Sequence, residues 1–178
     1  MELHQNEPIA SPPAGAVANG SEFGPQLNLF GIAQTELTSN DYYTPSWIFS
    51  ELKITFDIDV ASPPNGPPFT PCKKYFTQLD DGLIQPWTGT VFMNPPFSNP
   101  GMWVAKWLDH ANGIALLPFS KSAWFDKLWD SEAAIVRLPW NLKFNDPKGG
   151  GGSIFLACLL AGLGETNIKA LHNIGKVR

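Results

Sequence analysis

The chain has 178 residues, of which 43% are hydrophobic and 16% are charged, and its net charge at pH 7 is −4. This composition excludes a chain that is disordered along its whole length, and the longest apolar runs are too short to span a bilayer. Two cysteines exclude a disulfide framework and a cysteine-rich zinc site, so we expect no metal. No signal peptide is visible, and a reducing cytoplasm is the expected compartment.

The first part of the chain is predicted to be a flexible arm. Residues 1–38 are rich in Pro, Gly, Ala, Ser and Asn and have no sustained apolar period, except for an apolar island at 23–32. Residues 1–52 contain six acids and neither Lys nor Arg, so residues 53–178 hold 12 basic and 10 acidic side chains. The body of the chain is therefore mildly basic, which permits contact with phosphates without requiring it.

Residues 39–178 have the pattern of a single α/β domain. A short helix is predicted after Pro45, and alternating polarity at 54–60 predicts a strand. Five prolines exclude regular structure at 62–71. Further strands are expected at 91–93, 114–119, 135–138, 142–144 and 154–160, and further helices around 103–108, 124–129 and 168–171. Strands that alternate with helices predict an α/β sheet, and two closely spaced strands near the C-terminus predict an antiparallel edge.

The strand at 91–93 runs into Asn94, Pro95, Pro96 and Phe97. Ligands of open α/β sheets bind beyond the carboxyl ends of the strands, which is where this tetrapeptide stands. The prolines fix φ and donate no N–H, the asparagine offers one acceptor and two donors, and the phenylalanine ring is flat. These groups suit a planar substrate that carries an –NH₂ group, although a strand-end turn with a core phenylalanine has the same sequence.

The tetrapeptide resembles the (Asn/Asp/Ser)-Pro-Pro-(Tyr/Phe/Trp) motif of S-adenosylmethionine-dependent amino-methyltransferases. A wider, ordered set of segments resembles the phage-type DNA N6-adenine methyltransferase (Dam) family over roughly residues 40–160. These segments are 41–45, 56–62, 75–77, 80–83, Trp87, 91–97, 116–118, Trp124 and 141–144. The resemblance implies a Rossmann-like methyltransferase sheet with an antiparallel C-terminal strand. It also implies a phage or prophage enzyme that works in the bacterial cytoplasm.

The reaction implied by the resemblance is methyl transfer from S-adenosylmethionine to N6 of adenine in double-stranded DNA. Asn94 and the carbonyl of Pro95 would accept hydrogen bonds from the amino group, on the rigid platform that Pro96 completes. Phe97 would stack on the base after it has been flipped out of the duplex. The sulfonium makes the methyl group electrophilic, so direct in-line transfer depends mainly on positioning.

The resemblance also assigns residues to the cofactor. Tyr43, Thr44 and Pro45 match the segment that holds the methionine end, where the start of a helix would point N–H groups at a carboxylate. Asp59 matches an acid at a strand end near the cofactor, and Asp81 matches a position that often meets the cofactor's adenine.

The sequence departs from the family pattern in one segment, and it leaves the role of one acidic residue open. The segment 59–66 has no Gly-x-Gly, and with the prolines that follow it we expect the usual second strand and helix to be shortened or absent. For Asp80, a local cap or a solvent-exposed position is as credible as a cofactor contact.

Contact with the DNA backbone is expected from Lys143 and Lys148, which lie beside the glycine run at 149–152. This run lacks the Lys-Ser/Thr of a phosphate-binding loop and is predicted to be a mobile hairpin. The four tryptophans between 103 and 129 stand at helical spacing with apolar neighbours, which favours packing in the core over base stacking.

The apolar island of the arm contains Gln26, Leu27, Leu29 and Phe30. The segment 26–30 resembles the Gln-Leu-x-Leu-Phe peptide by which bacterial DNA-processing proteins dock on the sliding clamp. Such a peptide inserts apolar anchors into a pocket while the glutamine orients its backbone. The alternative is that the island packs on the domain as an extra strand.

Three functions remain open at this point. The first is a DNA adenine-N6 methyltransferase. The second keeps the chemistry and changes the acceptor to cytosine N4, an RNA base or a protein glutamine. The third is a catalytically silent DNA- or clamp-binding protein, which the missing glycine loop would explain.

Overall fold

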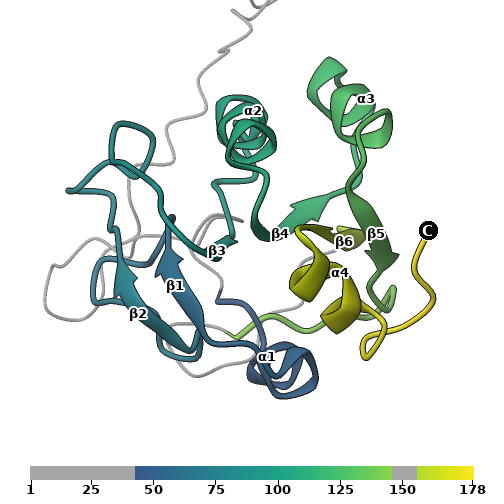
Figure 1. The fold of residues 1–178 in the computed structure, drawn as a ribbon, viewed down its shortest axis with the longest axis horizontal. Helices are drawn as coiled ribbons and strands as arrows, with labels where there is room; N and C mark the ends of the chain where they lie inside the picture. Colours follow the sequence, from purple (N-terminus) through teal and green to yellow (C-terminus); the bar gives the residue numbers. More distant parts are fainter. Residues whose placement is uncertain (1–42, 146–155) are drawn as a thin grey trace, which may run out of the picture. The chain divides into compact units, whose positions relative to one another are not determined.

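The computed structural model describes residues 43–145 and 156–178. These residues form a six-stranded sheet with helices on both faces (Figure 1). The strands are β1 (Phe56–Asp59), β2 (Cys72–Tyr75), β3 (Val91–Met93), β4 (Gly113–Pro118), β5 (Ala134–Arg137) and β6 (Cys158–Leu163). The described helices are α1 (Ser46–Leu52), α2 (Gly101–His110), α3 (Ala123–Trp129) and α4 (Glu165–Leu171). The predicted arm, its peptide at 26–30, and Lys148 lie outside the described residues.

The strand order is β2-β1-β3-β4-β6-β5. Strands β2, β1, β3 and β4 are parallel, whereas β6 is antiparallel to both β4 and β5. The predicted α/β sheet with an antiparallel C-terminal strand is thereby confirmed. The antiparallel strand is not itself the edge, because β6 is inserted between β4 and β5.

Alternate residues of the strands supply two hydrophobic cores, one on each face of the sheet. In β4, Ile114 and Leu116 belong to the core that α1 and α4 cover, whereas Ala115 and Leu117 belong to the core that α2 and α3 cover. Successive side chains of a strand point to opposite faces, so a strand buried on both sides is apolar throughout. This burial explains why β3, β4 and β6 are continuous apolar runs in the sequence, whereas β1 alternates in polarity and β2 is mostly exposed.

Two local predictions differ from the structure. Residues 142–144 are not a strand, although Leu142 and Phe144 are buried: their apolar pattern reflects burial in the core, and the adjacent pairing is a single bridge between Asn145 and Tyr43. The strand predicted at 154–160 begins at Cys158 and continues to Leu163, because it pairs with the whole of β4.

The second strand of the sheet is present but short. β2 has four residues and runs parallel to β1, in agreement with the expectation that this part of the fold is reduced. Residues 60–71, which connect the two strands, contain no helix. The prolines in this connection cannot donate helical hydrogen bonds, which accounts for its irregular course.

The strand order reverses between β1 and β3. β1 is followed by β2 on one side, while β3 lies on its other side and is followed by β4. Asp59 at the end of β1 is in register with Phe92, two residues before Asn94. In open α/β sheets, such a switch point leaves a crevice at the carboxyl ends of the strands. Residues 94–97, which follow β3, are called the Asn-Pro-Pro-Phe corner below. The fold therefore brings the end of β1 and this corner to the place where a ligand site is expected.

Candidate active site

A pocket of about 660 Å³ opens at this switch point. Its size is that of a small-molecule or cofactor site. Its wall comes from the segment before α1, the end of β1 and the loop after it, the loop after β2, the end of β3, and α2. Six predicted site residues belong to this wall: Tyr43, Thr44, Asp59, Asp81, Asn94 and Pro96. The structure thus brings together residues that are up to 53 positions apart in the sequence.

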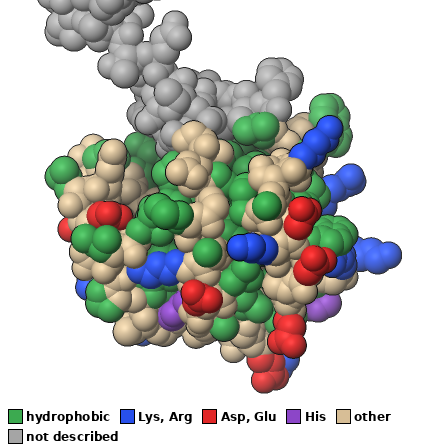
Figure 2. Space-filling model, turned by 90° about the horizontal axis from the view of Figure 1, so that it is seen from above, with side chains coloured by type: hydrophobic (Ala, Val, Ile, Leu, Met, Phe, Trp, Pro, Cys, Tyr) green, Lys and Arg blue, Asp and Glu red, His purple; other side chains and the backbone are tan. Residues whose placement is uncertain are grey.

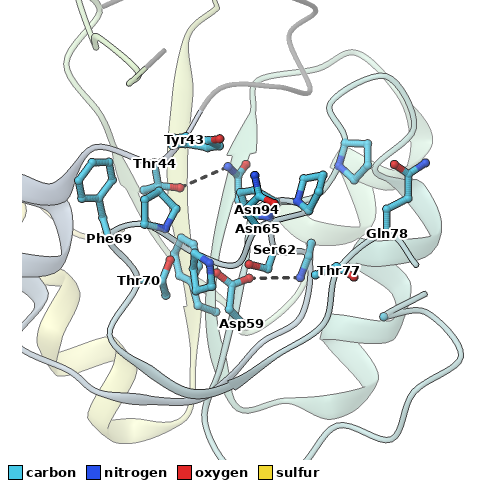
Figure 3. A pocket seen from close by; sticks show the side chains of 18 of the residues that line it. Tyr43, Thr44, Asp59, Ser62, Asn65, Phe69, Thr70, Thr77, Gln78 and Asn94 are labelled. Atoms are coloured by element: carbon cyan, nitrogen blue, oxygen red, sulfur yellow. Dashed lines mark hydrogen bonds between the residues drawn. The ribbon is translucent and has the colours of Figure 1, made fainter. Parts of the chain in front are cut away.

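Asn94 is held at the pocket by Thr44. Its Nδ2 donates a hydrogen bond of 3.3 Å to Oγ1 of Thr44, which is 5% exposed (Figure 3). Within the described part of the chain, no group donates to Oδ1 of Asn94. An amide that is fixed through its nitrogen in this way keeps its oxygen as an acceptor for a ligand.

The two prolines use their carbonyl groups differently. The oxygen of Pro96 accepts a hydrogen bond of 3.1 Å from the backbone N–H of Asn99, which closes a tight turn. No donor among residues 43–145 and 156–178 reaches the carbonyl of Pro95. Pro95 is buried and is not part of the pocket wall, so its ring packs inside while its carbonyl keeps acceptor capacity.

Phe97 lies beside the pocket and is absent from its wall. It is half-buried, and its ring meets Phe144 edge-to-face with centroids 6.3 Å apart. Edge-to-face contact fixes the orientation of a ring without covering both of its faces. Phe144 is fully buried, so the segment that carries it supports the Asn-Pro-Pro-Phe corner.

Asp59 is a buried carboxylate in the wall of the pocket. It is 3% exposed, and burial raises its pKa to about 6. Hydrogen bonds from the hydroxyl of Thr70 and from the backbone N–H of Ala61, at 3.2 Å, oppose this rise. Among the described residues it has no ion-pair partner. A carboxylate that is buried without a counter-charge is costly and marks a place where a ligand with donor groups would be favourable.

The proline-rich loop after β1 contributes more to the pocket than the sequence indicated. Ser62, Phe69 and Thr70 line the wall. Ser62 is 6% exposed, and no described residue forms a hydrogen bond with its hydroxyl. A buried hydroxyl without a partner is unfavourable unless a ligand or water meets it. The position of this loop directly after the first strand was the signal that could have identified these residues.

The loop after β2 forms the opposite part of the wall. Asp81 lines the pocket with a left-handed backbone (φ 52), and its carboxylate accepts a hydrogen bond from the N–H of Leu83. Asp80 accepts hydrogen bonds from the N–H and the hydroxyl of Thr77, which lower its pKa. Asp80 is not part of the wall and acts as a local cap, the alternative that the sequence left open.

The predicted tryptophan core is confirmed in part. Trp107 is fully buried, whereas Trp103 is half-buried, lines the pocket and stacks against Trp87 with centroids 6.4 Å apart. Trp129 is 43% exposed and lies under the guanidinium of Arg178 at 3.3 Å from its ring centroid. Helical spacing identified the buried face of α2 but did not separate pocket positions from core positions.

Pro45 and Lys143 lie together at a second, smaller hollow of about 360 Å³. Lys143 is exposed and follows β5, and the backbone of Tyr43 pairs with that of Asn145 next to it. Figure 2 looks onto the face that α2 and α3 cover, where Lys and Arg side chains are interspersed with acidic and hydrophobic ones. The mild positive charge of the body is therefore not gathered on that face.

S-adenosylmethionine carries an ammonium, a carboxylate, ribose hydroxyls and an adenine, and the pocket offers groups that match them. Asp59 and Asp81 are acceptors for donor groups, and Ser62 provides a hydroxyl to which no described residue forms a hydrogen bond. The half-buried ring of Trp103 and the exposed ring of Phe69 give the wall flat apolar surface. The residues present therefore fit this cofactor.

The sheet order and the Asn-Pro-Pro-Phe corner at the switch point place the protein among the Rossmann-like methyltransferases. The sequence model of the Dam family, described as DNA N-6-adenine-methyltransferase, matches residues 33–139, and the chain belongs to this family. In general terms it is therefore a DNA adenine methyltransferase, as the sequence predicted. The match ends before 141–144, the last segment of the predicted resemblance. No curated protein matches the chain.

No helix in the described ranges is long and apolar enough to cross a membrane. Residues 43–145 and 156–178 contain no group of three His, Cys, Asp or Glu side chains that could hold a metal ion. Cys158 is buried and burial raises its pKa to about 12, so its thiol is not a candidate nucleophile.

Proposed function

We propose that the protein transfers a methyl group from S-adenosylmethionine directly to N6 of an adenine that is flipped out of double-stranded DNA. The observation that supports this proposal is the pair of acceptors at the end of β3. Oδ1 of Asn94 and the carbonyl of Pro95 receive no hydrogen bond from the described residues, while Nδ2 of Asn94 is engaged by Thr44.

The two acceptors would bind the two hydrogens of an exocyclic amino group. Hydrogen bonds that hold both N–H groups in fixed directions reduce the conjugation of the nitrogen lone pair with the ring, so that the lone pair can attack. S-adenosylmethionine supplies an electrophilic methyl group on its sulfonium. Phe97, with its ring oriented by Phe144, would stack on the flipped base, and positioning would provide most of the rate enhancement.

The cofactor would occupy the rest of the pocket. Tyr43 and Thr44 would lie at its methionine end, with Asp59 near its ammonium and Asp81 toward its adenine, and the hydroxyl of Ser62 would find its partner there. Pro45, which is not part of the pocket wall, would act by setting the start of α1. This arrangement would give the hydroxyl of Ser62 a hydrogen-bond partner and the carboxylate of Asp59 an ion-pair partner, neither of which the described residues supply.

The test measures methyl transfer from labelled S-adenosylmethionine to unmethylated duplex DNA, followed by nucleoside analysis. N6-methyladenine is expected from the wild-type protein. Asn94→Ala is expected to abolish transfer while S-adenosylmethionine still binds by calorimetry. Asn173→Ala, at an exposed asparagine that bonds the carbonyl of Glu51 on α1, is the matched control. Near-normal turnover of Asn94→Ala would contradict the proposed role of this side chain.

The same analysis separates the other acceptors. N4-methylcytosine in the DNA digest, or label in RNA or in protein glutamine, would replace adenine as the substrate while keeping the chemistry of Asn94. Absence of both transfer and cofactor binding would leave a catalytically silent DNA- or clamp-binding protein.

We also propose that the peptide Gln26 to Phe30 docks the enzyme on a bacterial sliding clamp. The support is the sequence match alone, since these residues lie outside the described ranges. Tethering to the clamp would raise the effective concentration of a small enzyme on DNA. Leu29→Ala combined with Phe30→Ala should remove co-elution with the clamp without changing activity on short oligonucleotides. Undiminished co-elution of the double variant would refute the assignment.

A further inference from the structure

Lys106 of α2 places its ammonium group against backbone carbonyls. Nζ donates to the oxygens of Gly82, Leu83 and Gln85 at 3.2, 2.7 and 2.6 Å. A lysine ammonium has three N–H donors, so all of them are used within one loop. Nζ also lies 4.7 Å from the ring centroid of Trp87, and no described carboxylate forms an ion pair with it.

The segment Asp80 to Gln85 depends on side chains for its shape. It contains no helix or strand, so the carbonyls it buries need partners from elsewhere. Besides the three bonds from Lys106, the indole N–H of Trp87 donates to the oxygen of Gly82 at 2.8 Å. The amide of Gln85 donates back to the oxygen of Asp80 at 2.7 Å. Of these three side chains, Lys106 donates hydrogen bonds to the largest number of carbonyls.

This segment also supplies part of the pocket wall that follows β2. Asp81 and Gly82 line the pocket, and Gly82 approaches the end of β1 so closely that a Cβ atom there would lie 2.0 Å from the carbonyl oxygen of Val60. Lys106 itself is not part of the wall. Its three bonds go to backbone carbonyls of the loop, so it can act on a ligand only by setting the positions of Asp81 and Gly82.

We propose that Lys106 is a positioning residue for the cofactor: its ammonium group holds the carbonyls of Gly82, Leu83 and Gln85 and thereby fixes the wall that receives the cofactor's adenine end. The inference rests on the proposed function, which makes S-adenosylmethionine the ligand of this wall. A compact ammonium suits three convergent carbonyls, whereas the planar fork of an arginine suits carboxylates and phosphates.

The test compares Lys106→Met, which keeps the apolar stem over Trp87 and removes the donors, with Lys169→Met as the matched control. Lys169 forms an exposed ion pair with Glu165 on α4 and does not line the pocket. Affinity for S-adenosylhomocysteine is measured by calorimetry, and KM for S-adenosylmethionine and kcat are measured on duplex DNA. Hydrogen–deuterium exchange is followed on the peptide that covers 80–85.

For Lys106→Met we expect the Kd for S-adenosylhomocysteine and the KM for S-adenosylmethionine to rise together by roughly tenfold, with kcat at saturating cofactor within about twofold of wild type. The amides of 80–85 should exchange faster, and Lys169→Met should match wild type in every measurement. If Lys106→Met does not fold, Lys106→Gln replaces it, with an expected rise of about threefold because its amide keeps two donors.

A folded Lys106 variant with wild-type Kd would overturn the inference and leave the proposed function intact. A fall in kcat at unchanged KM would also overturn it, because that pattern indicates general damage to the enzyme. If the wild-type protein binds neither cofactor nor product, the proposed function fails together with the inference, so the two failures are distinguishable.

Discussion

Replacement of Asp59 by asparagine is expected to stabilise the protein while weakening its cofactor site. The pKa of this carboxyl group is raised from 3.8 to about 6 by burial. Between these two values the folded protein holds a proton that the unfolded chain releases, so the free energy of unfolding falls as the pH rises through this range. The difference amounts to about 3 kcal/mol, all of it lost above pH 6.

Asp59→Asn removes this cost because the amide is neutral at every pH. Its oxygen can still accept from the N–H of Ala61, but its NH₂ group cannot replace the acceptor that Thr70 uses. We therefore expect a net gain of about 1 to 3 kcal/mol at pH 8, equivalent to a rise in Tm of roughly 3 to 10 °C. At pH 4 the gain should be close to zero, because Asp59 is then already protonated in the folded protein.

The assay is urea denaturation of the cofactor-free protein between pH 4 and 8, followed by tryptophan fluorescence. Asp57→Asn is the matched control on the same strand. Asp57 binds Nζ of Lys73 and the N–H of Thr90, both at 2.8 Å, and these contacts lower its pKa. Its replacement should therefore reduce stability at pH 8. A loss of stability for Asp59→Asn that is equal at pH 4 and pH 8 would refute the reasoning.

Three further predictions concern Gly82 in the pocket wall, Phe97 beside the pocket, and Lys143 as a contact to DNA. Gly82→Ala places a Cβ against the carbonyl of Val60 and should cost about 1 to 3 kcal/mol in urea denaturation; unchanged stability would contradict the close approach. Phe97→Ala should lower kcat/KM on duplex DNA by roughly 10- to 100-fold, while Phe97→Tyr stays within a few fold; equal losses in both would argue against base stacking. Lys143→Ala should make the slope of log DNA affinity against log salt concentration shallower by about one phosphate contact. An unchanged slope in DNA-binding titrations at several salt concentrations would exclude Lys143 from the DNA interface.

Most of the sheet was predictable from the sequence because β3, β4, β5 and β6 are apolar strands that end at clear signals. The mostly exposed β2 has no such pattern, and no strand was predicted at 72–75. Phe92 and Met93 are followed at once by Asn94 and two prolines, so the end of β3 and the motif were visible together. Buried apolar residues outside the sheet give the same signal as strands. The segment that ends at Phe144 was therefore misread, since its burial comes from packing against α1 and the Asn-Pro-Pro-Phe corner.

The sequence predicted the candidate site residues that belong to a motif. It did not predict those whose position depends on long-range contacts. Asp59 ends β1 and Asn94 follows β3, so both were predicted as site residues, and the structure places both in one pocket. The bonds from Lys106 to the loop at 82–85 join residues 21 to 24 positions apart on a helix and a loop. Neither the hydrophobic pattern of the sequence nor its secondary-structure propensity specifies such a contact, because the contact forms only when α2 packs beside the loop after β2.

The loop after β1 shows how the fold can form a pocket without a glycine-rich turn. A glycine turn lets backbone N–H groups approach a ligand, whereas prolines have no N–H to offer. Prolines also restrict the unfolded chain, so a wall built from them loses less conformational entropy when it becomes ordered. The prolines leave fewer backbone N–H groups for polar contacts, so side chains gain importance: Ser62 and Thr70 line the pocket while Gly66 turns the chain at φ 85. Single substitutions at Ser62 or Thr70 should therefore change cofactor affinity more than substitutions in a backbone cradle would.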